Sequence, residues 1–250
     1  MLRRRPALYA LGVLVLLAIW AVLSAFYPPV ILPSPLEAGA ALIGLARSGA
    51  LFREVGITLA RILIAFSVSA AAGSALGILA GLQPRLYPLL KPAVDLALSA
   101  PPISWLVLAL IWFGTGSATP IFTVIMVATP VVFANAYQGV RAVDRELVGM
   151  ARAYGARGRQ LVEDVYLPAL SSYLFAGLSV AGSLAVRTAV MGELLGSDSG
   201  VGNALALARI YLETPQVFAW VGVTVALLAA LEGLLIRPLQ RRAEAWRWKA

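Results

Sequence analysis

Residues 96–140 read LALSAPPISWLVLALIWFGTGSATPIFTVIMVATPVVFANAYQGV, and none of these 45 residues is charged. A helix that crosses a bilayer needs about 20 mostly apolar residues. This run is therefore too long for one spanning helix and fits two, over residues 89–113 and 119–139. Gly114-Thr115-Gly116-Ser117 is the turn expected between them. Pro101 and Pro102 should kink or break the first of the two helices. The stretch thus predicts a helical membrane protein.

The composition of the whole chain points the same way. The 250 residues are 60% hydrophobic and only 13% charged, with a mean hydropathy of +0.86. A soluble domain is about 25% charged, so this chain lacks the charges to cover a water-facing surface, and its apolar content excludes disorder. Cysteine and histidine are absent. The absence excludes disulfides, Cys metal sites and the commonest general base.

Four further apolar stretches predict spanning helices over residues 7–27, 57–82, 165–187 and 215–236. The first resembles a signal peptide but is longer than an h-region of about 7–15 residues, so we interpret it as a retained span. The fold class is therefore an all-α polytopic membrane protein with about six transmembrane helices in one domain, residues 1–250. A short surface helix is expected near Pro35–Arg47. Small residues at spacing four in the second span, Ser69, Gly73, Gly77 and Gly81, predict a seam where another helix packs closely.

The distribution of lysine and arginine predicts the orientation. Fifteen of these residues fall in segments on one side of the six spans and three on the other. Cytoplasmic loops carry the excess of positive charge, so both termini and the loop over residues 140–168 are expected in the cytoplasm. The net charge of +8 is then a matter of topology and does not indicate nucleic-acid binding.

Catalytic and metal-binding patterns are missing from the sequence. No stretch matches the P-loop pattern G-x-x-x-x-G-K-[ST], and the only lysines are Lys91 and Lys249. Asp95, Glu193 and Glu232 do not form the closely spaced carboxylate cluster of a metal or hydrolytic site. We therefore expect no enzyme activity, no ATPase site, no metal and no cofactor on this chain.

The loop over residues 140–168 is the longest connection on the predicted cytoplasmic side. It reads as two helical pieces with Gly155 and Gly158 near the break, and small residues make the first piece thin: Gly149, Ala151, Ala153 and Ala156. A thin helix at a loop tip suits insertion into a groove on a partner protein. The alternative is an ordinary amphipathic surface helix.

The same loop resembles the EAA motif of bacterial ABC importer permeases, EAA-x3-G-x9-I-x-LP. Gly155 is followed after nine residues by Val165-Tyr166-Leu167-Pro168, and Ala151 takes the place of the second alanine. The departures are Gly149 where Glu is usual and Met150 where the first Ala is usual. Further segments resemble the nitrate/sulfonate/taurine branch: Leu32-Pro33-Ser34-Pro35, Thr58-Leu59-Ala60-Arg61, APPISWLVLALIWFGTG at 100–116, Gly177, MGELLGSDSGVG at 191–202 and RRAEAWR at 241–247.

This resemblance implies a type I ABC importer permease in the bacterial inner membrane. Two permeases, here expected to be identical, would form the pathway for a small anionic solute such as nitrate, a sulfonate or taurine. Two cytoplasmic ATPase subunits would bind ATP, and an extracytoplasmic substrate-binding protein would deliver the solute. The residues implied in ATPase coupling are Gly149, Ala151, Arg152, Ala153, Gly155, Ala156, Leu167 and Pro168. A vitamin precursor, either a pyrimidine or a riboflavin-like compound, is the alternative solute, and a secondary transporter or an intramembrane enzyme is the alternative class.

Ionisable residues inside a membrane are candidates for function. We expect Arg61 and Asp95 to pair structurally. Arg187, toward the outer half of the fifth span, either attracts an anionic solute or snorkels to the interface. The candidates for the pathway are Pro101, Pro102, Trp105, Arg187 and Glu193, with the prolines and the tryptophan shaping it.

Overall fold

The computed structural model describes residues 5–233, and this range contains helices and no strand. The all-α class is therefore confirmed. The helices are α1 (Arg5–Ser24), α2 (Pro35–Arg47), α3 (Ala50–Leu82), α4 (Leu86–Ser99), α5 (Pro102–Phe113), α6 (Ala118–Arg141), α7 (Arg145–Ala153), α8 (Arg159–Leu161), α9 (Leu167–Gly196), α10 (Val201–Ile210) and α11 (Thr214–Leu231). A π-helical turn, Val162–Tyr166, precedes α9. The end of the span expected over 215–236 and the RRAEAWR segment lie outside the described residues.

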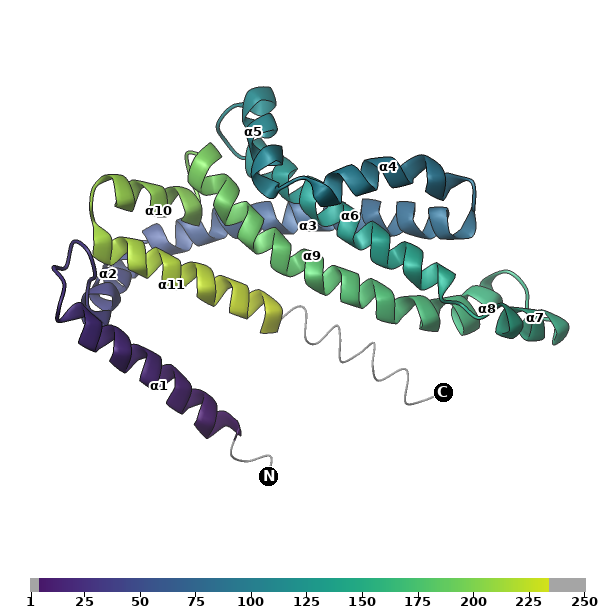
Figure 1. Ribbon diagram of the computed structural model, residues 1–250, viewed down its shortest axis with the longest axis horizontal. Helices are drawn as coiled ribbons and strands as arrows, with labels where there is room; N and C mark the ends of the chain where they lie inside the picture. The colour runs from purple at the N-terminus through teal and green to yellow at the C-terminus, as the bar shows by residue number, and fades with distance from the viewer. Residues whose placement is uncertain (1–4, 234–250) are drawn as a thin grey trace.

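Helix α6 forms the centre of the bundle. It packs against α3 on one side and α9 on the other more extensively than any other pair of helices, as Figure 1 shows. Small and β-branched side chains fill the contact: Ile62 and Ala65 from α3, Val124, Ala128 and Val132 from α6, and Ala181, Ala185, Val186 and Ala189 from α9. Each of these side chains is almost fully buried. The three helices therefore form one rigid frame.

The seam of small residues on α3 faces α6, as its spacing predicts. A Cβ atom at Gly73 would lie 2.7 Å from the Cβ of Val132, and one at Gly77 would lie 2.5 Å from the carbonyl oxygen of Phe133. Heavy atoms of this kind do not approach so closely, so α3 and α6 reach their observed separation only because these side chains are absent.

The proline pair at 101–102 separates two helices. Helix α4 ends at Ser99, Ala100 adopts an extended conformation, and α5 begins at Pro102 with a bend of 99° between the two axes. A residue before proline is disfavoured in the helical region, and proline is well suited to the first turn of a helix. The kink or break expected at this point is confirmed, and it is a complete break.

Five of the six expected spans correspond to described helices selected by length and hydropathy. Four described helices are long and apolar enough to cross a membrane, α3, α6, α9 with the residues before it, and α11, and the α4–α5 pair raises the number to five. The helix expected over 7–27 is found as α1, whose 20 residues match the length of about 20 that a bilayer requires.

The bundle has two contrasting ends, which are named here by the helices that lie there. At the α10 end, α2 and α10 pack beside the start of α3; at the α7 end, α7 and α8 lie beyond the last residues of α6 (left and right in Figure 1). Helix α2 covers the residues of the expected surface helix, and Ser34 and Glu37 form a capping box at its start. The 33 residues of α3 connect the two ends over about 50 Å.

Candidate functional site

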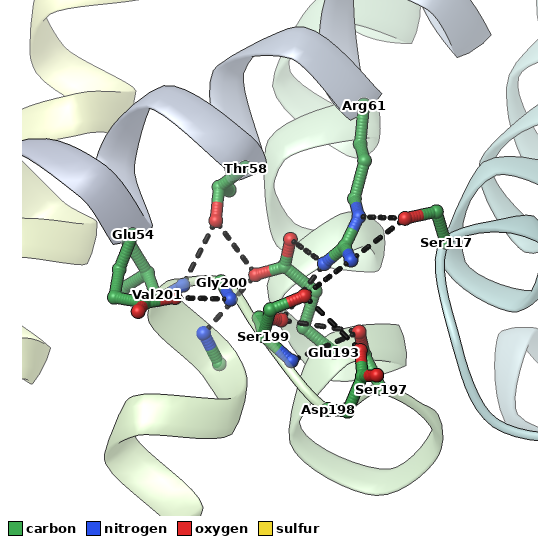
Figure 2. Close-up of polar contacts among 11 residues, drawn as sticks. Glu54, Thr58, Arg61, Ser117, Glu193, Ser197, Asp198, Ser199, Gly200 and Val201 are labelled. Carbon is green, nitrogen blue, oxygen red and sulfur yellow. Dashed lines mark hydrogen bonds and ion pairs between the residues drawn. The ribbon is translucent and has the colours of Figure 1, made fainter.

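A buried cluster of polar side chains lies at the α10 end (Figure 2). Helix α3 contributes Glu54, Thr58 and Arg61, whose spacing of four and three residues places them on one helix face. Helix α9 contributes Glu193 near its last turn. The segment Ser197–Gly200 and the start of α10 close the cluster. Residues more than 130 positions apart in the sequence are thus brought into contact.

The centre of the cluster is an ion pair between Arg61 and Glu193. Arg61 Nη1 lies 2.8 Å from Glu193 Oε1, and the two side chains are 4% and 0% exposed. Arg61 also donates to the Ser199 carbonyl at 2.8 Å, to Ser199 Oγ at 2.8 Å and to Ser117 Oγ at 3.1 and 2.8 Å. These contacts use all five N–H groups of the guanidinium. A buried charge is tolerated when it is paired and hydrogen-bonded in this way.

The same carboxylates cap the start of α10. Glu54 Oε2 accepts from the backbone N–H of Gly200 at 2.6 Å, and Glu193 Oε2 accepts from Gly202 at 3.1 Å. Thr58 Oγ1 accepts from Val201 at 2.9 Å and donates to Glu193 at 2.7 Å. The first N–H groups of a helix lack partners within it and carry partial positive charge. Side chains from α3 and α9 supply those partners, so the cluster fastens α10 to the bundle.

Gly200 is essential to this arrangement. Its φ is +95°, in a region that favours glycine, and a Cβ atom there would overlap the Glu193 carboxylate. The cluster is therefore closed: its members bind one another and leave no room for a solute.

The structure corrects the expected pairing of Arg61 with Asp95. Arg61 pairs with Glu193, and Asp95 pairs with Lys91 one turn earlier on α4. Residues four apart on a helix are neighbours by geometry, so Lys91 is within reach of Asp95 wherever α4 lies. The assignment of Glu193 to a solute pathway finds no support in the contacts, because the side chain is fully buried among the chain's own donors.

The other candidates for the pathway lie apart from this cluster. Pro101 and Pro102 are exposed at the α4–α5 break, and Trp105 is partly buried on α5 with no acceptor for its Nε1. Arg187 is exposed on α9 and has no hydrogen bond or ion pair to any residue that the structure describes. The prediction for these residues stays a prediction, and Arg187 is the one whose charge has no partner.

The expected coupling loop folds in two pieces at the α7 end. Helix α7 begins at Asp144, whose side chain accepts from Glu146 N at 2.8 Å. It ends in a Schellman motif, in which Gly155 N donates to Arg152 O and Ala156 N donates to Ala151 O, each at 3.0 Å. Gly155 takes φ +88°. The break expected near Gly155 is present, and its backbone conformation favours glycine over residues other than asparagine or aspartate.

The residues predicted to couple to an ATPase differ in exposure. Gly149, Arg152, Ala153 and Gly155 are exposed, and Ala151 and Ala156 are half-buried. Leu167 and Pro168 form the first turn of α9, with Leu167 45% exposed. Val143, Val148 and Leu161 bury the opposite face of α7 and α8 in a small apolar core of their own. Ala151 packs against this core, whereas Gly149, Ala153 and Gly155 remain exposed.

A helical bundle of this length and hydropathy belongs to the class of polytopic membrane proteins. Comparison with known families is more specific. Residues 73–247 match the family described as binding-protein-dependent transport system inner membrane component, and the chain belongs to that family. It is a permease component of an ATP-driven ABC importer, which favours this interpretation over a secondary transporter or an intramembrane enzyme.

Three relatives show how the similarity extends along the chain. The chain is 30% identical to the putative aliphatic sulfonates transport permease protein SsuC of Bacillus subtilis (strain 168), over 93% of this chain and 85% of the relative. It is 29% identical to the taurine transport system permease protein TauC of Escherichia coli (strain K12), over 97% and 90%. It is 27% identical to the formylaminopyrimidine transport permease protein ThiX of Halalkalibacterium halodurans, over 94% of each.

A solved structure shares the fold. A chain of the inward-facing MetNI methionine ABC transporter aligns with a TM-score of 0.62 and 21% identity, over 77% of this chain and 94% of that one. The type I importer permease fold implied by the resemblance is therefore confirmed.

Two functional residues were missed from the sequence. Glu54 and Thr58 take part in the buried cluster, and neither was a site candidate. Their spacing to Arg61 was the available signal: a carboxylate, a hydroxyl and a guanidinium on one face of a helix that was otherwise read as apolar. Within the described part of the chain, no group of three or more His, Cys, Asp or Glu side chains could hold a metal ion.

Proposed function

We propose that this permease conducts a small anionic solute of the sulfonate or taurine type, nitrate included, and that two identical copies form the pathway. In this proposal both termini and the α7 end are cytoplasmic, and an ATPase subunit binds the exposed face of α7. The ATPase supplies the ATP hydrolysis, because the sequence of the permease has no P-loop pattern. A substrate-binding protein delivers the solute at the α10 end. The relatives named for aliphatic sulfonates and taurine support the solute class.

The observation that carries the solute class is the unpartnered charge of Arg187. This residue lies nine positions before the end of α9 at Gly196, which corresponds to a depth of about 14 Å along the helix axis. A guanidinium facing lipid at such a depth costs about 2.5 kcal/mol or more. Because no described side chain neutralises it, the charge is best accounted for if Arg187 faces a water-filled pathway or a second copy. In a pathway it would attract an anion.

The orientation rests on two features. Among the described residues, seven lysines and arginines lie in segments 83–91 and 141–159 at the α7 end, and three lie at the α10 end. The α7–α8 loop also leaves the apolar side chains of Leu147, Met150 and Tyr154 exposed beside its small residues. Both features favour a cytoplasmic α7 end that a partner protein contacts.

The experiment is solute uptake into proteoliposomes that contain the permease, its ATPase and the binding protein. We expect ATP-dependent uptake of taurine or an alkylsulfonate by the wild-type complex. Arg187→Gln should lower the uptake at least tenfold, which corresponds to about 1.4 kcal/mol, and Arg187→Lys should retain part of it. Arg209→Gln, an exposed arginine on α10, is the matched control and should transport normally.

The same assay tests the alternative solute. The relative named for formylaminopyrimidine transport supports a pyrimidine as the second candidate. A pyrimidine without an anionic group would not need Arg187. Uptake of a pyrimidine that Arg187→Gln leaves unchanged, without any uptake of sulfonate or taurine, would replace the first proposal with the second.

A further inference from the structure

A cavity of about 710 Å³ lies at the α7 end, between the spanning helices and the loop. Its walls come from the last turn of α3, the end of α6, helix α7 and the turn before α9. The lining residues are Gly81, Leu82, Pro84, Val140, Arg141, Val143, Val148, Gly149, Arg152 and Tyr166. Its size lies within the range of about 300–1,000 Å³ that is typical of small-molecule sites.

The cavity contains two positive charges and no negative one. Arg141 and Arg152 line it, and neither has an ion pair or hydrogen bond to any residue in the described part of the chain. Each lies in the last turn of its helix. A helix C-terminus carries only about half a negative charge, so the two C-termini together offset about one of the two positive charges and leave about one without a counter-charge.

Gly149 lies in the same wall, where the loops that this one resembles have glutamate. A Cβ atom at Gly149 would meet nothing within 4 Å. The backbone therefore leaves open space beside the two guanidiniums at the position where a carboxylate would be expected, and an outside anion can take that place.

We propose that this cavity binds the phosphodiester headgroup of an anionic phospholipid. The uncharged run of α3 reaches the cavity at Leu82 and that of α6 reaches it at Val140, so the proposed orientation puts the cavity near the cytoplasmic headgroups. Its walls combine the guanidiniums with Leu82, Val140 and Val143, which suits a ligand with a charged head and apolar chains. Basic pockets between transmembrane helices on the cytoplasmic side bind such headgroups. The inference rests on the cytoplasmic position of the α7 end in the proposed function.

The test measures lipid binding directly. The full-length chain is purified in neutral detergent, and its melting temperature is followed during titration with phosphatidylglycerol, with phosphatidylcholine and with inorganic phosphate. We expect only phosphatidylglycerol to raise the melting temperature. In the double variant Arg141→Gln/Arg152→Gln the affinity should fall about thirtyfold, which corresponds to about 2 kcal/mol. Arg157→Gln, an exposed arginine of the same loop that does not line the cavity, should bind like the wild type.

A second variant supplies the missing carboxylate. Gly149→Glu should abolish the phosphatidylglycerol effect by placing a counter-charge inside the cavity. It should not unfold the protein, because the site has room and Glu favours a helix more than Gly does. Loss of the lipid effect at unchanged melting temperature without lipid therefore supports the proposal.

Three outcomes would overturn it. An equal effect of inorganic phosphate would make the cavity a free-anion site. An unchanged lipid effect in the double variant would place the lipid elsewhere. No lipid effect, together with loss of ATPase co-purification in the double variant, would assign the arginines to an acidic side chain of the ATPase. The assay requires no transport, so its failure leaves the solute proposal standing, and failed transport leaves the lipid result standing.

Discussion

The two ends of the bundle treat their charges in opposite ways. At the α10 end, Arg61 is 4% exposed and every one of its N–H groups has an acceptor within the chain. At the α7 end, Arg141 and Arg152 are exposed and have no partner among the described residues. At the α10 end the protein itself supplies the partners of the buried charge, whereas at the α7 end the two arginines are available to a charge from another molecule.

The charges at the α10 end therefore stabilise the fold, whereas those at the α7 end can bind another molecule. The α10 end uses charge to hold a short helix in place, since α10 has only ten residues and isolated helices of that length are marginal. The α7 end leaves small side chains, open space and positive charge on its surface. Substitutions at the α10 end should therefore lower stability, whereas substitutions at the α7 end should weaken binding in a folded protein.

The largest expected effect is that of Arg61→Leu. Removing the guanidinium leaves the Glu193 carboxylate buried and unpaired, which typically costs 3–5 kcal/mol. The free energy of unfolding, measured by titration with dodecyl sulfate in mixed micelles, should fall by about that amount.

The controls for Arg61→Leu separate lost charge from lost packing. Arg209→Leu, at an exposed position on α10, should leave the free energy of unfolding nearly unchanged. The double variant Arg61→Leu/Glu193→Leu should regain part of the loss, because no unpaired charge remains. If Arg61→Leu were as stable as Arg209→Leu, the cluster would not hold the α10 end together.

The next effect concerns α3, which connects the two ends. Gly77→Ala places a methyl group 2.5 Å from the carbonyl oxygen of Phe133, so α3 and α6 must move apart. Such overpacking costs about 1–3 kcal/mol. Gly56→Ala is the same substitution on the same helix in open space, and it should raise stability by up to about 1 kcal/mol. The difference between the free energies of unfolding of the two variants measures how much the close packing of α3 against α6 contributes to stability. Equal free energies would mean that this packing contributes nothing.

Sequence patterns predicted the frame well and the contacts within it poorly. The uncharged runs, the glycine seam and the proline break depend on local composition or on a single helix face, so they can be read from one stretch of chain. The cluster around Glu193 depends on how α3 and α9 are placed relative to each other, and no local pattern specifies that. Arg61 was therefore assigned to Asp95, another acid in a predicted span, although Lys91 was closer to Asp95 along the helix. The cavity beside Gly149 likewise depends on the meeting of four separate segments.

A smaller effect is expected at the α7 end from Gly155→Val. The residue has φ +88°, and a left-handed conformation costs other residues about 1–2 kcal/mol. The strain is local to the Schellman turn, so the bundle should still melt as in the wild type while co-purification with the ATPase falls about tenfold. Gly155→Asn is the matched control, because asparagine tolerates this conformation, and it should keep the ATPase. Equal loss in both variants would mean that contact with the side chain matters rather than the turn.

The smallest effect is expected from Lys91→Gln, which removes the exposed ion pair between Lys91 and Asp95. Lys91 and Asp95 have side chains 49% and 53% exposed, one helical turn apart on α4. Water screens such a pair and solvates each partner after the other is removed, so exposed pairs contribute little. We expect the melting temperature of Lys91→Gln to equal that of the wild type, and to remain equal when salt is raised from low to high concentration. A loss of stability as large as that of Arg61→Leu would show that this face of α4 is buried in the purified protein, because only a buried ion pair has so large an effect when it is broken. The same measurement on cross-linked dimers would then identify whether a second copy provides the cover.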